Sequence, residues 1–482
     1  MKTLIALLLC FTIQSFAQKP LKISKETTWF TEPLKKDGTV DYIKALNLKY
    51  NTITDPDKNI AYAFMAFINI KEIDKLPDEL RKFYSPKATF FDDFRDLEMD
   101  SDDDLVEFLN SPWSKDDNVD LFNFFEEHNK SIDAALKLFH RPEYKLPIPE
   151  DMELLGIDFP YRYYIRTFAK IINIRSNLYI NNGLYDKAIN DLSVIKKFGE
   201  NYSDRPFYLE FIAGVWISRW SNDSIKNLLA SKLKKKDLEK VLELLKPSLD
   251  KDYLSAESAV NGERAKDLDF LSRCAKDPIY FLETITFSNE VSAKRIKRFV
   301  SISDIDWNEV AKAINRHHDL ILSAENTLKQ QEIDIKRDEI FSKSNKRFLE
   351  FHKKYKLDNS NLLSYVGVRF NSDFVVDIFY RHLFFNSINP IIRAKETKIE
   401  SHLLYLATLS RLYQLEYKKA PRQFSDLSKL KHDLPINPYT EKAYKFNLIE
   451  SHFTFLADGI KADKKSKENQ IELKLKINPA SP

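Results

Sequence analysis

The sequence predicts a mainly α-helical protein, a multi-helix assembly of helical hairpins that ends in a small C-terminal α+β unit. Apolar residues recur at helical spacing along most of the chain. The 482 residues include only 8 glycines, and glycine is the residue that tight β-turns most often need. A hydrophobic share of 43% is sufficient for large cores. The expected parts are a signal peptide (1–17), an N-terminal helical region (18–150), a helical-hairpin core (151–397) and a C-terminal helix with a small β-hairpin (398–482).

The first part of the chain has the order of features found in secretory signal peptides. Lys2 provides a positive start, an apolar run extends from Leu4 to Phe11, and Ser15 and Ala17 supply small residues before a cleavage site. The run is shorter than the roughly 20 residues that a membrane-spanning helix needs. We expect cleavage after Ala17 and an exported protein, periplasmic or secreted, with no membrane span after signal removal; a buried N-terminal helix is the alternative.

Cysteines and overall charge restrict the chemistry of the mature chain. Cys10 follows bulky Leu9, which argues against a lipid anchor. Cys274 is then the single remaining cysteine, so no intramolecular disulfide is possible, and its helical surroundings favour a buried thiol. Lys and Arg total 75 and Asp and Glu total 72, a balance that gives no reason to expect a nucleic-acid partner. The basic run Lys234–Lys236, preceded by Lys232, is typical of a solvated helix end.

The N-terminal helical region contains two clear amphipathic segments. Asp55 and Pro56 are typical of a helix start, and Ile60, Phe64, Phe67 and Ile68 then recur on one face. A second helix is expected between Asp116 and His140, closed by Pro142. Its apolar face consists of Leu121, Phe124, Phe125, Ile132, Leu136 and Leu138.

The core region is expected to contain two successive helices from Tyr161 to Phe198, broken at Asn181–Gly183. Small Ala188 would allow the two helices to approach. The spacing of a tetratricopeptide-like hairpin is shared by Leu178, Gly183, Tyr185, Ala188 and Leu192. No second copy follows at that period, so a solenoid is not predicted. Further helices are expected over 206–229, 237–245, 255–275 and 307–355, the last as one or two long helices.

The last part of the chain changes from helical to alternating periodicity. A long apolar helix through Leu403–Leu415 precedes Pro421. The segments Tyr444–Leu448 and His452–Leu456 alternate strictly and predict a β-hairpin, and Ile471–Ile477 predicts an edge strand. We expect the aromatic face of the hairpin to pack on the helix that carries Leu406, Leu409 and Tyr413. That face consists of Tyr444, Phe446, Phe453 and Phe455.

Several short motifs resemble a family of uncharacterised exported bacterial proteins of unknown function. The motifs are Gly38–Tyr42 with Ala45–Asn47, Asp55-Pro56 through Asn59, Ser111-Pro112-Trp113, Arg141-Pro142, and Gly262-Glu263-Arg264 with Leu268-Asp269. The resemblance covers most of the chain. It implies no activity, cofactor or catalytic residue.

The C-terminal segment also resembles the C-terminal part of major pseudopilins. The shared positions are Leu412, Tyr413, Pro421, Phe424, Leu427, Asn437, Pro438, Tyr444, Phe446 and Ala457–Gly459. This resemblance implies a long helix that packs on a small sheet. The helix is internal here, so filament assembly is not implied. Lysines after Gly459 depart from the calcium loop of that family.

The search for sites of chemistry returns weak candidates only. Asp100, Asp102 and Asp104 match the first ligands of an EF-hand loop, but Leu105 replaces the glycine of its turn, and a helix capped by Ser101 is the preferred interpretation. His317 and His318 are adjacent, point about 100° apart on a helix and have no zinc-motif partner. No nucleotide loop or nucleophile elbow is present, so no metal or cofactor is expected and the catalytic residues are unknown.

Two functions of different class remain open. The favoured one is a non-enzymatic protein-interaction or binding protein of the cell envelope or exterior, with an unknown protein or glycan partner, because helical hairpins form binding grooves. The alternative is a helical-toroid glycan hydrolase or lyase, in which paired carboxylates about 5 to 10 Å apart act as acid and base. Acidic residues are too frequent for the sequence to single out such a pair.

Overall fold

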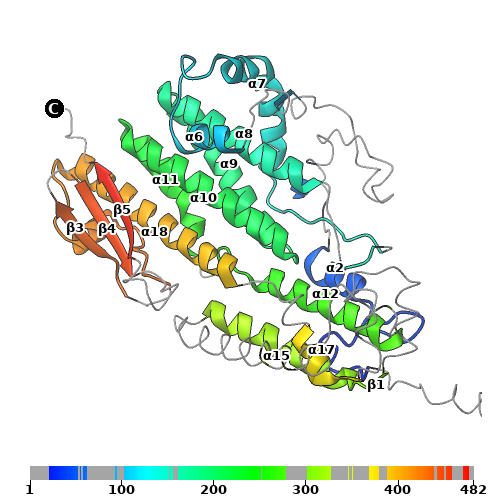
Figure 1. The fold of residues 1–482 in the computed structure, drawn as a ribbon. Helices are drawn as coiled ribbons and strands as arrows, with labels where there is room; N and C mark the ends of the chain where they lie inside the picture. Colours follow the sequence, from blue (N-terminus) through cyan, green and yellow to red (C-terminus); the bar gives the residue numbers. More distant parts are fainter. Residues whose placement is uncertain are drawn as a thin grey trace, which may run out of the picture.

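The fold of the chain is given by a computed structural model, drawn in Figure 1. It confirms a mainly helical assembly with a small sheet at its C-terminal end. The structure describes residues 21–52, 55, 58–61, 64, 93–94, 102–150, 152–155, 161–250, 252–277, 280, 301–326, 346, 350, 369–378, 388–438, 442–449, 452–458 and 470–476.

Helices make up most of the elements in the described residues, and the strands are few and short. The α-helices are α2 (Tyr42–Tyr50), α6 (Asp102–Asn110), α7 (Val119–Phe139), α8 (Tyr161–Asn181), α9 (Tyr185–Ser203), α10 (Tyr208–Ala230), α11 (Lys235–Leu245), α12 (Glu257–Lys276), α15 (Trp307–Asn326), α17 (Ser372–Ile378) and α18 (Ile388–Tyr417). The 3-10 helices are η3 (Lys246–Leu249) and η6 (Phe424–Leu430), and the strands are β1 (Ser301–Asp304), β2 (Arg369–Asn371), β3 (Lys445–Ile449), β4 (His452–Asp458) and β5 (Gln470–Lys476).

Helix α10 lies at the centre of the assembly, in contact with α8 and α9 on one side and with α12 and α18 on others (Figure 1). Buried residues occur on most of its faces, which is typical of a helix surrounded by partners. The buried residues Ile217, Ile225 and Leu228 belong to the cores that surround it. Every other long helix of the described residues is therefore positioned, directly or through one neighbour, by α10.

The predicted hairpin of α8 and α9 is confirmed, and its turn depends on Gly183. This residue has a φ of +68°, a left-handed conformation that glycine adopts without steric cost. The amide of Leu184 donates to the carbonyl of Tyr179 at 2.9 Å, and the amide of Gly183 donates to that of Ile180 at 3.1 Å. This pair of bonds is the Schellman motif, which satisfies the last carbonyls of α8 and reverses the chain.

A very close contact of two helices lies between α9 and α10, at Gly199 and Gly214, rather than at Ala188. A Cβ atom on Gly214 would lie 2.6 Å from the carbonyl oxygen of Gly199 and 2.4 Å from the amide nitrogen of Ser203. The two backbones therefore approach so closely that neither glycine can carry a side chain without a shift. Ala188 is buried, but in the separate core formed with α11 and α18.

An extended segment, residues 143–148, is held against the N-terminal helices by asparagine side chains. Asn47 exchanges two hydrogen bonds with the backbone of Ile148, at 2.7 and 2.8 Å. Asn59 does the same with Lys145, at 2.6 and 2.9 Å. Each side-chain amide presents a donor and an acceptor side by side, so it pairs with a backbone as a neighbouring strand would. We call these two residues the asparagine clamp.

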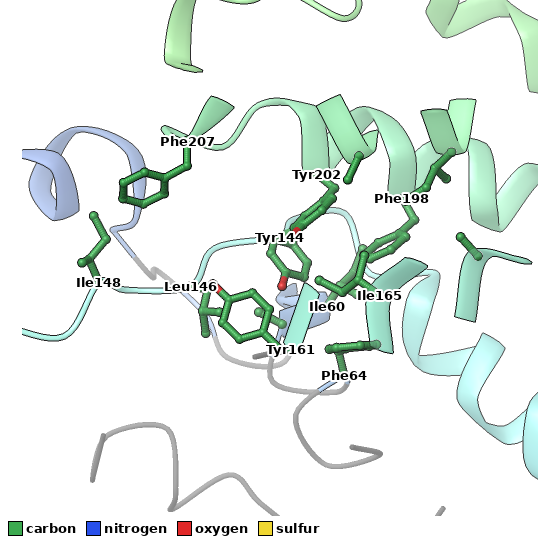
Figure 2. Packing of buried hydrophobic residues seen from close by; sticks show 14 of the residues in the cluster. Ile60, Phe64, Tyr144, Leu146, Ile148, Tyr161, Ile165, Phe198, Tyr202 and Phe207 are labelled. Carbon is green, nitrogen blue, oxygen red and sulfur yellow. The ribbon is translucent and has the colours of Figure 1, made fainter. Parts of the chain in front are cut away.

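The inward positions of this segment alternate, as in a β-strand. Tyr144, Leu146 and Ile148 are buried in the largest core, where Tyr144 packs edge-on against Phe198 and Tyr202 (Figure 2). The centroids of these ring pairs are 5.7 and 5.3 Å apart, in the range of favourable aromatic contacts. The segment thus connects the N-terminal region to α9 by a row of buried side chains.

Replacing Asn59 with alanine is expected to destabilise the protein by about 2 kcal/mol. The side chain is buried, and its loss leaves the amide and carbonyl of Lys145 without their partner. Urea unfolding measures the change. Thr52→Ala is the control, because its hydroxyl donates to the Leu48 carbonyl in an exposed position and should cost little. Equal midpoints for the two variants would show that the clamp does not hold the segment.

The C-terminal unit consists of α18 and an antiparallel sheet of order β3-β4-β5. The predicted hairpin is confirmed as β3 and β4, with Phe446 opposite Phe455, and the predicted edge strand is β5, with Leu473 opposite Phe455. Tyr444 and Leu473 are buried in one core with Leu406, Leu409 and Tyr413 of α18. The side chains of Phe446, Phe453 and Phe455 lie outside the described residues.

Helix α18 begins at Ile388, before the position 398 at which the sequence analysis places the C-terminal unit. It contacts α10 and α11 as well as β4, β5 and η6. The predicted helix 116–140 corresponds to α7, and those over 206–229, 237–245 and 255–275 correspond to α10, α11 and α12. Of the remaining expectations, the signal peptide, Phe67, Ile68 and the residues beyond 326 of the long helix lie outside the described residues, except Lys346 and Glu350, which are helical.

Candidate functional site

Among the described residues, four clusters of charged or polar side chains are centred on buried groups, and the first links α10 to the extended segment 143–148. Arg205 forms an ion pair with Glu210 at 3.4 Å, donates to the carbonyl of Leu146 at 2.8 Å and donates to Asn51. Tyr161 of α8 donates to Glu210 at 3.4 Å. Burial raises the pKa of Glu210, and the charge of Arg205 opposes that shift. The cluster connects α8, α10 and the extended segment.

The second cluster joins α7, α8 and α9. Arg175 makes a bidentate pair with Asp191, at 2.8 and 2.9 Å, and a third contact with Asp133 at 2.8 Å. Burial raises the pKa of Asp191 to about 6, against the attraction of Arg175. A guanidinium whose N–H groups are bonded to carboxylates of neighbouring helices typically has a structural role.

The third cluster lies between α9, α10 and α18. The ammonium of Lys196 donates to Asn222 at 2.7 Å and to Ser401 at 3.1 Å, and it faces the ring of Tyr253. A serine beside a lysine is an arrangement used for nucleophilic catalysis. Here both side chains are buried, and the hydroxyl of Ser401 already bonds the Thr397 carbonyl of its own helix. The contacts favour a structural role.

Next to this cluster, His402 forms hydrogen bonds that connect the C-terminal unit to the helices. Its Nε2 lies 2.9 Å from the carbonyl of Ser248, which can only accept, so Nε2 carries the proton. Its Nδ1 then accepts from the hydroxyl of Tyr444 at 2.9 Å. Burial lowers the pKa of His402 to about 4, so the ring stays neutral at ordinary pH. This histidine is a positioning residue for Tyr444.

The fourth cluster joins α12 to α15. Asp267 and His318 lie 2.9 Å apart and are both buried. Beside them Arg264 forms an ion pair with Asp319 at 2.6 Å and lies over the ring of Trp29 at 5.1 Å. These contacts connect α12, α15 and the N-terminal segment.

A different kind of cluster lies on the surface of α10 and α18. Trp216 is 45% exposed, and the guanidinium of Arg219 lies over its ring at 5.8 Å. Leu209, two turns earlier on the same helix face, is 53% exposed. Two carboxylates stand near Arg219, Asp223 on α10 and Glu400 on α18, and both are half-buried. We call this set the α10 patch.

The two carboxylates of the α10 patch have perturbed protonation. Burial raises the pKa of Asp223, against the charges of Arg219 and Lys226. Burial also raises the pKa of Glu400, and the charges of Asp223 and Glu396 add to that shift while Arg219 opposes it. Carboxylates with raised pKa values beside exposed aromatic residues are features of ligand sites. The α10 patch is therefore the candidate functional site.

The residues of the α10 patch do not stand out in the sequence. Asp223 and Glu400 lie on helices far apart in the chain, so no local spacing connects them. One signal was available for Trp216. Apolar residues surround most of the first half of α10, from Leu209 to Ile217, and a helix of this kind either is enclosed completely or exposes apolar residues.

Residues considered for chemistry from the sequence lie outside the patch. Cys274 is buried and its pKa is raised by burial, which makes it an unreactive thiol. His317 and His318 are buried on α15, and burial lowers the pKa of both. Asp102 and Asp104 fall in the first turn of α6, while Asp100 and the side chains of 102–104 lie outside the described residues. Lys234 is the residue that precedes α11, and its backbone amide donates to the carboxylate of Asp237 in the first turn of that helix at 3.0 Å.

The motif Gly262-Glu263-Arg264 has a structural role in this fold. Gly262 allows α12 to touch the backbone carbonyl of Pro206. The carboxylate of Glu263 accepts from the amide of Tyr208 at 3.2 Å, which satisfies the N-terminus of α10. Trp113, from another motif of the resemblance, donates its indole N–H to the carbonyl of Ile174 at 2.8 Å. Each of these residues joins two elements.

The described residues contain no group of three histidine, cysteine or acidic side chains arranged to share a metal ion. None of the described helices has an apolar stretch of the length needed to cross a bilayer. Comparison of the chain with protein-family models, curated proteins and solved structures finds no match in any of the three.

Proposed function

We propose that this chain is an exported binding protein of the cell envelope or exterior that holds its partner through the α10 patch. The observation that supports this function is the exposure of Trp216 and Leu209 on the helix at the centre of the assembly. Tryptophan and arginine are the residues that most often dominate the energy of protein interfaces. The guanidinium of Arg219 already lies over the ring of Trp216, so less freedom is lost when a partner covers them.

The scaffold under the patch is rigid, which suits a binding role. The opposite faces of α10 meet α8, α9 and α12, and the buried ion pairs of Arg205 and Arg175 join the helices around it. A preformed surface on rigid helices binds with a smaller entropic cost than a loop. The export part of the proposal rests on the signal peptide predicted at residues 1–17.

Replacing Trp216 with alanine should reduce partner affinity at least tenfold. A partly exposed ring contributes little to stability, whereas a central tryptophan in an interface contributes about 2 kcal/mol or more. The protein is used to capture partners from envelope extracts, and calorimetric titration with the purified partner gives the affinity. Leu48→Ala is the matched control, since Leu48 is a 62% exposed apolar residue on α2. Unchanged affinity in Trp216→Ala would refute the role of the patch.

The enzyme alternative receives support from one observation, the raised pKa values of Asp223 and Glu400 on facing helices. A glycan hydrolase or lyase needs one carboxylic acid that keeps its proton near neutral pH and a second carboxylate near it. Reducing-sugar release from a panel of envelope and matrix glycans tests this function, with Glu400→Gln and Asp223→Asn beside wild type. Release by wild type that both variants lose would support the enzyme, and no release by wild type would reject it.

A further inference from the structure

The crossing of α10 and α18 brings two carboxylates from distant parts of the chain to one surface. At the crossing, the buried amide of Asn222 donates to the carbonyl of Thr397 at 3.1 Å and accepts from the hydroxyl of Ser401 at 3.1 Å. Asp223 follows Asn222 on α10, and Glu400 precedes Ser401 on α18. These hydrogen bonds therefore fix the positions from which both carboxylate side chains leave their helices.

The opposite charges of the α10 patch lie near one another without forming ion pairs. Arg219 is close enough to both carboxylates for its charge to oppose the rise in the pKa of Asp223 and of Glu400. Among the described residues, however, no nitrogen of Arg219 lies within 4.0 Å of a carboxylate oxygen. Polar groups that face one another beyond hydrogen-bond distance are commonly bridged by water or by a ligand. The guanidinium thus offers donors, and the carboxylates offer acceptors, to a group that comes between them.

The charges of the patch balance. The nearby carboxylate of Glu396 is already paired with Arg393 at 2.7 Å. Lys226 is exposed and acts on Asp223 from the next turn of α10. Two positive charges, those of Arg219 and Lys226, therefore stand against the two carboxylates. A surface without net charge selects neither an anion nor a cation, and it suits a neutral ligand with many hydroxyl groups.

Trp216 adds an apolar surface to this row of polar groups. Its ring is 45% exposed and lies beside the guanidinium of Arg219. Trp216, Arg219 and Asp223 are spaced i, i+3 and i+7, so they follow one face of α10 over about 10 Å. An aromatic platform, a donor fork and an acceptor therefore succeed one another along the helix.

A sugar ring fits this arrangement better than the surface of a protein does. A pyranose has C–H groups on its faces and hydroxyl groups around its edge, so it can lie on Trp216 while its hydroxyls reach the charged groups. A protein that covered the patch with apolar side chains would remove both carboxylates from water without supplying donors, which is costly. Aspartate and glutamate are accordingly depleted in the cores of protein interfaces.

We propose that the α10 patch binds a neutral pyranose unit of a glycan, with the sugar ring stacked on Trp216 and its hydroxyls bridging Arg219 to the carboxylates of Asp223 and Glu400. The inference rests on the binding function proposed above and names the chemical class of the partner. The two carboxylates act as hydrogen-bond acceptors in it, and no bond of the glycan is broken.

Calorimetric titration of the full chain with neutral tetrasaccharides of glucose, xylose, mannose and N-acetylglucosamine tests the proposal. Wild type should bind at least one of them. Trp216→Ala should weaken that binding at least tenfold, and Trp216→Phe should retain most of it, because a smaller ring still supports the sugar. Tyr417→Ala is the matched control: Tyr417 is a 41% exposed aromatic residue on α18, about five turns from Glu400, and its loss should leave the affinity unchanged.

The polar half of the site has a separate test. Arg219→Met keeps an aliphatic side chain beside Trp216 but removes the donors, and it should weaken the binding about tenfold. The permethylated form of the same tetrasaccharide keeps the ring faces but has no hydroxyl to donate, so wild type should bind it at least tenfold more weakly. Equal affinity for the two forms of the sugar, or equal affinity of Trp216→Ala and wild type, would overturn the proposal.

Failure of this inference can be distinguished from failure of the proposed function. If wild type binds none of the neutral tetrasaccharides, or prefers tetragalacturonate to all of them, the inference is wrong. A protein partner that binds wild type but not Trp216→Ala would then show that the patch is a protein interface, and the binding function would stand. If Trp216→Ala affects neither kind of partner, both proposals are wrong.

Discussion

Replacing Gly262 with alanine is expected to lower the free energy of unfolding by at least about 3 kcal/mol, because the new methyl group has no space. The alanine Cβ would lie 1.5 Å from the carbonyl oxygen of Pro206. This oxygen belongs to the backbone that leads into α10, whose first amide, that of Tyr208, donates to Glu263. Relief of the overlap requires α12 to move away from α10, and the gain of about 1 kcal/mol in helix propensity does not offset that cost.

Gly183→Ala is the matched control for this prediction. Gly183 also resists substitution, but only because of its φ of +68°, and no atom lies within 4 Å of the new Cβ. An L-residue in that conformation costs roughly 1 to 2 kcal/mol. Urea unfolding followed by far-ultraviolet circular dichroism should place Gly262→Ala clearly below Gly183→Ala. The reverse order would show that α12 does not meet α10 at this glycine.

The second large effect is expected for Arg205→Met, which should cost about 3 to 5 kcal/mol. Methionine fills a similar space but leaves Glu210 buried without its cation and the carbonyl of Leu146 without its donor. Lys235→Met removes an exposed ion pair with Glu416, and it should cost less than about 1 kcal/mol. Urea unfolding of the two variants at neutral pH measures the difference between a buried and an exposed pair.

The pH dependence of Arg205→Met provides an independent check. Burial already raises the pKa of Glu210 in the folded protein, and loss of Arg205 removes the main opposing effect. A carboxyl group whose folded pKa is raised stabilises the protein at low pH, and this contribution is lost as the pH rises through the folded pKa. The variant should therefore lose stability from about pH 5 to about pH 8 more steeply than wild type. The double variant Arg205→Met/Glu210→Leu should regain much of the loss, and a failure to do so would contradict the buried-charge explanation.

Helical periodicity predicted the elements, but it could not predict how they meet. Helices α7, α8 and α9 follow from the spacing of apolar residues and from the Asn181–Gly183 break, which are local properties. The crossing at Gly199 and Gly214 depends on two helices at once, so neither glycine stands out in the sequence. The asparagine clamp is likewise an interaction between positions far apart in the chain.

The residues of the α10 patch could not be predicted from the sequence for a related reason. Asp and Glu are frequent on the surface, and nothing in the chain distinguishes Asp223 or Glu400 from the others. Their pKa values are raised because α18 lies against α10 and partly buries both groups. His317 and His318 are both buried on α15, and the pairing of His318 with Asp267 required the fold.

The asparagine clamp also fixes the number of residues between Lys145 and Ile148. Asn47 is hydrogen-bonded to Ile148, and Asn59 is hydrogen-bonded to Lys145. In both pairs the bonds go to the backbone of the residue in the segment and not to its side chain. The outward residues of the segment can therefore vary in chemistry with little penalty. An insertion or deletion of one residue between Lys145 and Ile148 would put one of the two contacts out of register and turn buried Leu146 or Ile148 toward water. The segment thus restricts its length much more strictly than its composition.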